Sequence, residues 1–141
     1  MGTEDADYIA SIAEAFGQAA PANWTEIHVE APSITEVTAF TARATLPTGE
    51  LESFYIEDDD LEEAVIDQIE ALRRSMAGRN DGRGAWFTMT LDISSDDTFA
   101  VQFDYDSRPA FDFEVSQESL LADLKVYPRS DAFYPDWLPR D

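Results

Sequence analysis

The sequence contains no cysteine, one histidine (His28) and one lysine (Lys125) among its 141 residues. Without cysteine the chain forms no disulfide and offers neither a thiol nucleophile nor thiolate ligands for zinc or iron–sulfur clusters. A Ser-His-Asp triad also lacks support, because no G-x-S-x-G segment is present. These absences exclude several common classes of enzyme active site.

The sequence also lacks a long apolar run. No stretch approaches the roughly 18 residues that a membrane-spanning helix needs, so we expect no membrane association. The first five residues include Glu4 and Asp5, whereas a secretory signal begins with basic residues. We therefore expect a cytoplasmic protein, with residues 1–141 forming one acidic domain.

Negative charge is what the sequence has in excess. The chain holds 30 Asp and Glu against 9 Lys and Arg, a net charge of −21. Residues 1–72 carry 17 of the acids and a single base, Arg43. Repulsion among these charges destabilises a compact state. The same charge keeps a protein soluble and attracts a basic partner over a long distance. A hydrophobic content of 44% favours a globular domain over an acidic disordered tail.

Hydrophobic spacing predicts the elements of the first half. Residues 5–20 place Ile9, Ile12 and Phe16 on one face of a helix that Pro21 ends. Three β-like runs follow at 24–30, 35–46 and 51–56. The acidic residues 57–60 then precede a second amphipathic helix, whose apolar stripe runs from Leu61 to Met76.

The second half begins with a glycine-rich loop over 78–84, which we expect to be flexible. Strands are predicted at 86–93 and 99–105, with Phe87 and Phe103 in core-facing stripes and a hairpin turn at 94–97. Ser116 is placed to cap a short third helix. The sequence thus predicts an α+β fold, an antiparallel sheet of about five strands with helices packed on one side, in the order α-βββ-α-ββ-α.

Two acidic patterns invite a metal-binding interpretation. Alternation puts Glu26, His28 and Glu30 on one strand face, and Asp58-Asp59-Asp60 is a dense carboxylate run. The polar face of a strand and the start of a helix explain the two patterns equally well, since acids complement a helix N-terminus. Neither pattern matches a complete metal-site motif, so we expect no metal and no cofactor.

Two further patterns invite a catalytic interpretation. Asp123-Leu124-Lys125, with Asp112 upstream, matches the D-x-K fragment of metal-dependent nucleases, although phosphate binding normally uses basic surface. Asp104 and Asp106 form a carboxylate pair, but neighbouring strand residues do not flank a substrate as in glycoside hydrolysis. We therefore predict no catalytic residue and no enzyme activity.

Aromatic residues near the C-terminus have two interpretations. Phe133, Tyr134 and Trp137 either fold back on the sheet or form part of a binding surface, where Trp and Tyr often dominate the binding energy.

In the predicted hairpin, residues 84–91 read GAWFTMTL and residues 99–106 read FAVQFDYD. This pattern resembles the YezG-like immunity proteins, in which a W-x-x-x-T-x-x-L-like strand precedes an F-x-x-x-F-D-Y-D-like strand. The usual turn glycine between the strands is replaced by Asp96-Asp97. The resemblance implies a non-enzymatic antitoxin that neutralises a secreted polymorphic toxin in the producing cell.

The charge and the resemblance lead to one functional expectation. We expect an immunity protein, monomeric when free, that binds a basic cognate toxin domain one to one and binds no nucleic acid itself. The alternative is an acidic DNA mimic or chaperone that occupies basic DNA-binding surfaces. The expected partner-binding residues are the densest acidic run, the strand pair of acids and one tail aromatic: Glu57, Asp58, Asp59, Asp60, Glu62, Glu63, Asp104, Asp106 and Trp137.

Overall fold

The computed structural model describes residues 3–79 and 82–140. Residues 80 and 81 of the loop expected to be flexible lie outside the described residues. The elements are α1 (Thr3–Ala19), β1 (Glu26–Ile34), β2 (Val37–Thr38), β3 (Thr41–Thr45), β4 (Leu51–Phe54), α2 (Asp59–Ala77), β5 (Thr88–Ser94), β6 (Phe99–Asp104), α3 (Gln117–Val126) and the short 3-10 helix η1 (Asp131–Phe133). The predicted α+β class and order of elements are confirmed.

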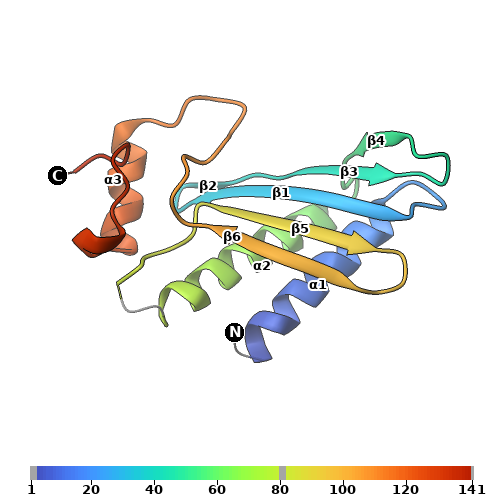
Figure 1. Ribbon diagram of the computed structural model, residues 1–141, viewed down its shortest axis with the longest axis horizontal. Helices are drawn as coiled ribbons and strands as arrows, with labels where there is room; N and C mark the ends of the chain where they lie inside the picture. Colours follow the sequence, from blue (N-terminus) through green and yellow to red (C-terminus); the bar gives the residue numbers. More distant parts are fainter. Residues whose placement is uncertain (1–2, 80–81, 141) are drawn as a thin grey trace.

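The strands form one antiparallel sheet in the order β4-β3-β1-β5-β6, with β2 paired to the end of β1. Side chains alternate across this sheet. Ile27, Val29 and Ala31 of β1 are buried beneath α1 and α2, which lie against one face (Figure 1). Glu26 and Glu30 of the same strand are exposed on the opposite face. We call this second face the open face, because α1 and α2 do not cover it.

The main core lies between that sheet and the two long helices. Ile9, Ile12 and Phe16 of α1 and Ile69 of α2 are fully buried in it, and Trp86 joins them from the segment before β5. The predicted apolar stripes of both helices therefore face the sheet, as the 3.6-residue period requires.

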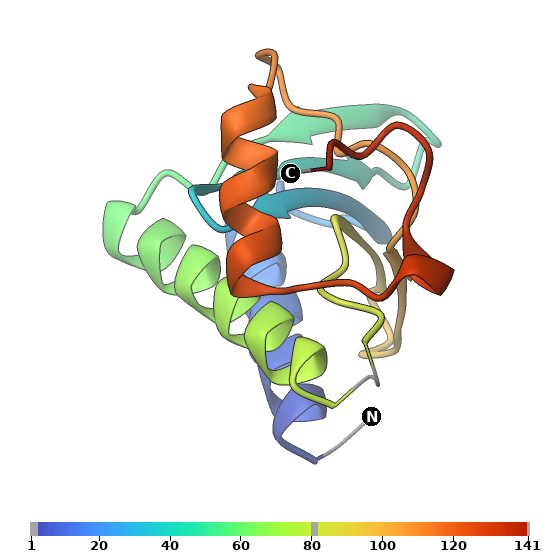
Figure 2. The ribbon, with the colours of Figure 1, turned by 90° about the vertical axis from the view of Figure 1, so that its left-hand side faces the viewer.

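A second, smaller core lies at the end of the sheet. Figure 2 shows α3 standing across this end, in front of the sheet. Leu120 of α3 packs there with Ile34, Phe87 and Leu138, so the C-terminal segment closes over the sheet end. Ser116 caps α3 as predicted, since its Oγ accepts a hydrogen bond from the Ser119 N–H.

Two strand boundaries differ from the prediction. β1 continues to Ile34 through Pro32, because the β3 pairing ends at the Glu30–Thr41 pair and the missing Pro32 N–H faces the side that β3 no longer occupies. The predicted strand 35–46 begins only after a turn at 35–36 and divides into β2 and β3, because the residues between them, 39 and 40, lie opposite the part of β1 where Pro32 has no N–H to donate.

The alternation predicted across 86–93 is wrong at Phe87. Met89, Leu91 and Ile93 lie in the main core, whereas Phe87 packs in the second core. The strand begins only at Thr88, and the Phe87 ring lies near the guanidinium groups of Arg73 and Arg129.

None of the helices in the described part of the chain is both long enough and apolar enough to cross a membrane.

The register of β6 gives a first testable prediction. Phe103 packs against the main core with its ring 5.2 Å from that of Trp86, whereas Phe99 is 42% exposed at the other end of the strand. Phe103→Ala should lower the free energy of unfolding by about 2 kcal/mol, less than the ~3–5 kcal/mol of a fully buried phenylalanine. Phe99→Ala should cost roughly 0.5 kcal/mol. Equal losses of the two variants in denaturant melts would contradict this register.

Candidate protein-binding surfaces

The densest acidic segment lies at the start of α2. We call Glu57, Asp58, Asp59, Asp60, Glu62 and Glu63 the acidic run. All of its side chains are exposed except that of Glu62, which is half-buried. Asp58 is the N-cap, its Oδ1 accepting hydrogen bonds from the N–H groups of Asp60 (3.0 Å) and Leu61 (3.1 Å). The acidic run thus starts the helix and also presents carboxylates to solvent.

A groove of about 530 Å³ lies beside the acidic run. It is bounded by the end of α1, the segment that follows β4 and the start of α2. Tyr55 lines the groove with 81% of its surface exposed, the highest value among the exposed large hydrophobic residues. Its neighbours differ, since Phe54 is half-buried and Ile56 is buried. Tyr55 was not among the expected partner-binding residues, although strand alternation from Phe54 to Ile56 already places it outward.

A second concavity, of about 350 Å³, lies on the open face. The strand register brings Glu30, Thr41, Thr90 and Asp104 to it from four different strands. The loop that follows β6 supplies the remaining wall, which includes Arg108, Phe111 and Asp112. We call this cavity the open-face pocket.

Asp104 holds the chain at the point where it leaves the sheet. Its Oδ1 accepts hydrogen bonds from the N–H groups of Asp106 and Ser107, both at 2.9 Å. Burial acts to raise the pKa of this carboxyl, but the backbone N–H groups of Ser107 and Asp106 outweigh burial and hold its pKa below the ordinary value. Asp104 therefore stays ionised at the rim of the open-face pocket.

Asp106 does not join Asp104 in that pocket. Its carboxylate is 72% exposed and lies 3.8 Å from Nη1 of Arg129, and its carbonyl oxygen accepts a hydrogen bond from Trp137 Nε1. The Arg129 guanidinium is buried and donates to the carbonyls of Ala85 and Tyr105, and burial lowers its pKa while Asp106 opposes that shift.

The tail folds back onto the second core. The Trp137 ring lies 5.4 Å from that of Phe87 and is half-buried, and the Tyr134 hydroxyl donates to the carbonyl of Pro139. Phe133 is 40% exposed. Trp137, the aromatic residue among the expected partner-binding residues, therefore already packs within the protein.

The residues considered for metal binding are held apart. His28 Nδ1 lies 2.7 Å from Asp92 Oδ1 on the neighbouring strand β5, rather than against Glu26 or Glu30. In the part of the chain that the structure describes, no group of three or more His, Asp or Glu side chains is arranged to hold a metal ion.

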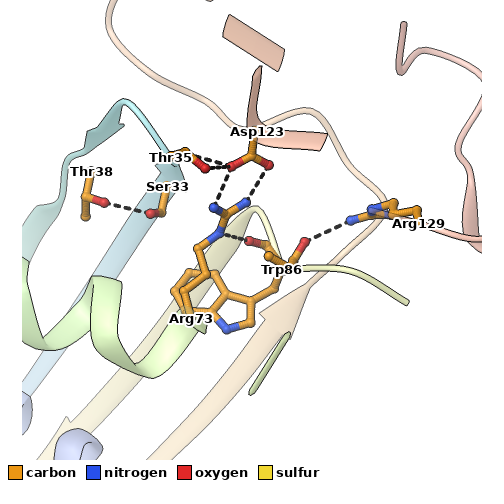
Figure 3. A network of polar contacts seen from close by, with 8 residues as sticks. Ser33, Thr35, Thr38, Arg73, Trp86, Asp123 and Arg129 are labelled. Atoms are coloured by element: carbon orange, nitrogen blue, oxygen red, sulfur yellow. Dashed lines mark hydrogen bonds and ion pairs between the residues drawn. The ribbon is translucent and has the colours of Figure 1, made fainter. Parts of the chain in front are cut away.

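A buried polar network joins α2, α3 and the turn after β1 (Figure 3). Asp123 accepts two hydrogen bonds from Arg73, at 2.7 and 2.9 Å, and two more from the N–H and hydroxyl of Thr35. Arg73 Nε also donates to the Trp86 carbonyl at 2.7 Å. Asp123 and Arg73 are each only 2% exposed.

This network gives Asp123 a structural role. The carboxylate that matched a D-x-K nuclease fragment is used by Arg73 and Thr35, Lys125 is exposed, and Asp112 lies in the open-face pocket. The structure does not bring these three residues together as a catalytic set.

No family model matches the chain, and no curated protein matches its sequence.

Proposed function

We propose that this chain is an immunity protein that binds and neutralises a basic cognate toxin domain, one acting on nucleic acid or nucleotides. It acts as a non-catalytic monomer in the cytoplasm and holds its partner one to one. The observation that carries the proposal is the exposed acidic run along a groove beside the exposed ring of Tyr55. An acidic surface next to an exposed aromatic is suited to a basic protein, because charge speeds encounter and an aromatic anchor slows release.

The charge of the whole chain supports the same partner chemistry. An enzyme that cleaves nucleic acid needs a basic cleft for its phosphates, and an acidic inhibitor is drawn to that cleft by its field. The acids of residues 1–72, which include the acidic run, outnumber their one base by 16. The resemblance of the β5–β6 hairpin to the YezG-like immunity proteins favours a toxin as that partner.

The test is the association rate with the cognate toxin domain, which the resemblance implies is encoded by a neighbouring gene. Asp58 is left unchanged because it caps α2, and the other five acids of the acidic run are neutralised as Glu57→Gln, Asp59→Asn, Asp60→Asn, Glu62→Gln and Glu63→Gln. At low salt the association rate constant should fall about tenfold, because these charges steer the encounter. Its salt dependence should also flatten, since the Debye length is about 8 Å at physiological salt. Stopped-flow fluorescence over a salt series measures both effects.

A matched control removes the same charge elsewhere, from the exposed acids Asp7, Glu14, Glu26, Glu114 and Glu118. This control should slow association by less than about threefold, because these acids lie outside the acidic run. If the two variants associate equally fast, the acidic run is ordinary solvated surface. Similar weak binding to several unrelated DNA-binding proteins, with no preference for one toxin, would instead favour an acidic DNA mimic.

A further inference from the structure

The open-face pocket is separate from the acidic run and its groove, and nothing in the proposed function yet uses it. Its apolar lining includes Pro32 and Phe111, and Thr88 and Thr90 add hydroxyl groups, whereas the ring of Phe40, which also borders the pocket, packs on Phe16 in the main core. Its volume of about 350 Å³ falls within the ~300–1,000 Å³ of typical ligand pockets. The pocket therefore accepts a group of side-chain size with both apolar and polar parts.

The charged residues that line the pocket favour a group with a positive charge. Three carboxylates line it, those of Glu30, Asp104 and Asp112, against the single cation Arg108. The Arg108 guanidinium lies 4.8 Å from the centroid of the Trp137 ring, so the folded-back tail already engages it. Among the described residues, no hydrogen bond or ion pair involves the carboxylates of Glu30 or Asp112. Two acids are thus available to a cation that enters the pocket.

The combination of an apolar lining and available carboxylates matches arginine or lysine. These side chains have an aliphatic stem that packs on apolar surface and a charged head that needs an anionic partner when it leaves water. An anion would be repelled by the three carboxylates, and a purely apolar group would leave Glu30 and Asp112 desolvated without partners.

The pocket also lies beside the groove that holds Tyr55. Phe40 and Thr41 line the pocket, and the next residue, Ala42, pairs with Phe54, which lines the groove. The paired strands β3 and β4 therefore border the two concavities, the pocket on the open face and the groove on the side of the helices. We expect one protein seated over these two strands to reach both.

We propose that the open-face pocket receives a single arginine or lysine side chain of the bound protein, with the stem on Pro32 and Phe111 and the charged head between Glu30 and Asp112. The inference rests on the proposed function in taking a basic protein as the partner, and it adds a second contact beyond the acidic run.

The test uses a short probe in place of the partner. Acetyl-Gly-Arg-Gly-amide is titrated into the full chain while amide resonances are followed by NMR, beside the citrulline peptide of the same shape without charge. The arginine peptide should shift the amides of Thr41, Thr88, Thr90 and Ser107 with a roughly millimolar Kd. The citrulline peptide should bind at least about fivefold more weakly, because the charge-assisted contacts are lost.

Paired variants separate the pocket from general attraction to an acidic protein. Glu30→Gln with Asp112→Asn should raise the Kd of the arginine peptide roughly fivefold to tenfold. Asp104 is left unchanged because it holds the loop after β6. The control, Glu26→Gln with Asp7→Asn, removes the same charge outside the pocket and should change the Kd by less than about twofold.

Shifts confined to other surfaces, or equal Kd values for the two paired variants, would overturn the inference and leave the proposed function standing. Shifts in the pocket together with an unchanged toxin association rate in the acidic-run variant would reject the proposed role of that run and keep the pocket.

Discussion

Asp123→Ala is expected to lower the free energy of unfolding by about 3–5 kcal/mol, a large fraction of the stability of a domain of this size. The substitution leaves the Arg73 guanidinium, 2% exposed, without the carboxylate that accepts two of its hydrogen bonds. It also removes the acceptor of the Thr35 N–H, which holds the turn between β1 and β2. Urea denaturation followed by far-UV circular dichroism measures the loss.

The matched control is Asp131→Ala. Asp131 pairs with Arg140 at 3.0 Å, and both of these side chains are largely exposed. An exposed pair contributes only ~0–1 kcal/mol, since solvent and salt screen the charges. Comparable losses in the two variants would mean that burial of the Arg73–Asp123 pair has no energetic consequence, contrary to the argument from desolvation.

The double variant Arg73→Met with Asp123→Ala separates two meanings of that result. If the single substitution is costly mainly because it strands a buried charge, removing the charge as well should restore part of the stability. A double variant as unstable as Asp123→Ala would show instead that the contacts of Arg73 with Trp86 and of Asp123 with Thr35 carry the loss.

The fold could be predicted where a single period controlled a segment. The 3.6-residue stripes of α1 and α2, and the alternation of β5 after Thr88, place their apolar residues in the core as expected. Prediction failed where a distant group overrides the local pattern. The turn at Thr35 depends on Asp123, 88 positions further along the chain. Phe87 departs from the alternation of β5, and its ring lies near the guanidinium groups of Arg73 and Arg129.

The candidate surfaces divide in the same way. The acidic run is nearly continuous in the sequence, so composition alone predicts it, and strand alternation predicts that Tyr55 is exposed. The open-face pocket could not be predicted, because its carboxylates come from positions 30, 104 and 112 and are brought together only by the fold. The pairing of Arg73 with Asp123 could not be predicted either. Arg73 lies on the buried side of α2, and nothing in the sequence around it indicates which acid pairs with it.

The position of Tyr55 decides which contact should control release of a partner. Its ring is exposed and free to be buried on binding, whereas the Trp137 ring already packs on Phe87. A buried aromatic ring at the centre of an interface often dominates the binding free energy. The contacts around it contribute little energy and mainly exclude water. Because Tyr55 lies beside the acidic run, we expect its ring, more than that of Trp137, to anchor the partner.

Tyr55→Ala should weaken binding of the cognate toxin domain by about 2–4 kcal/mol, a roughly 30-fold to 1,000-fold rise in Kd. The change should appear in the dissociation rate, because the substitution removes buried contact and leaves the steering charges in place. Surface plasmon resonance with immobilised toxin domain separates the two rates. Phe133→Ala, which removes another exposed ring far along the chain, serves as the control and should change Kd by less than about threefold. Tyr55→Phe should retain most of the affinity, since it keeps the ring. A Tyr55→Ala protein that dissociates at the wild-type rate would place the centre of the interface away from the groove.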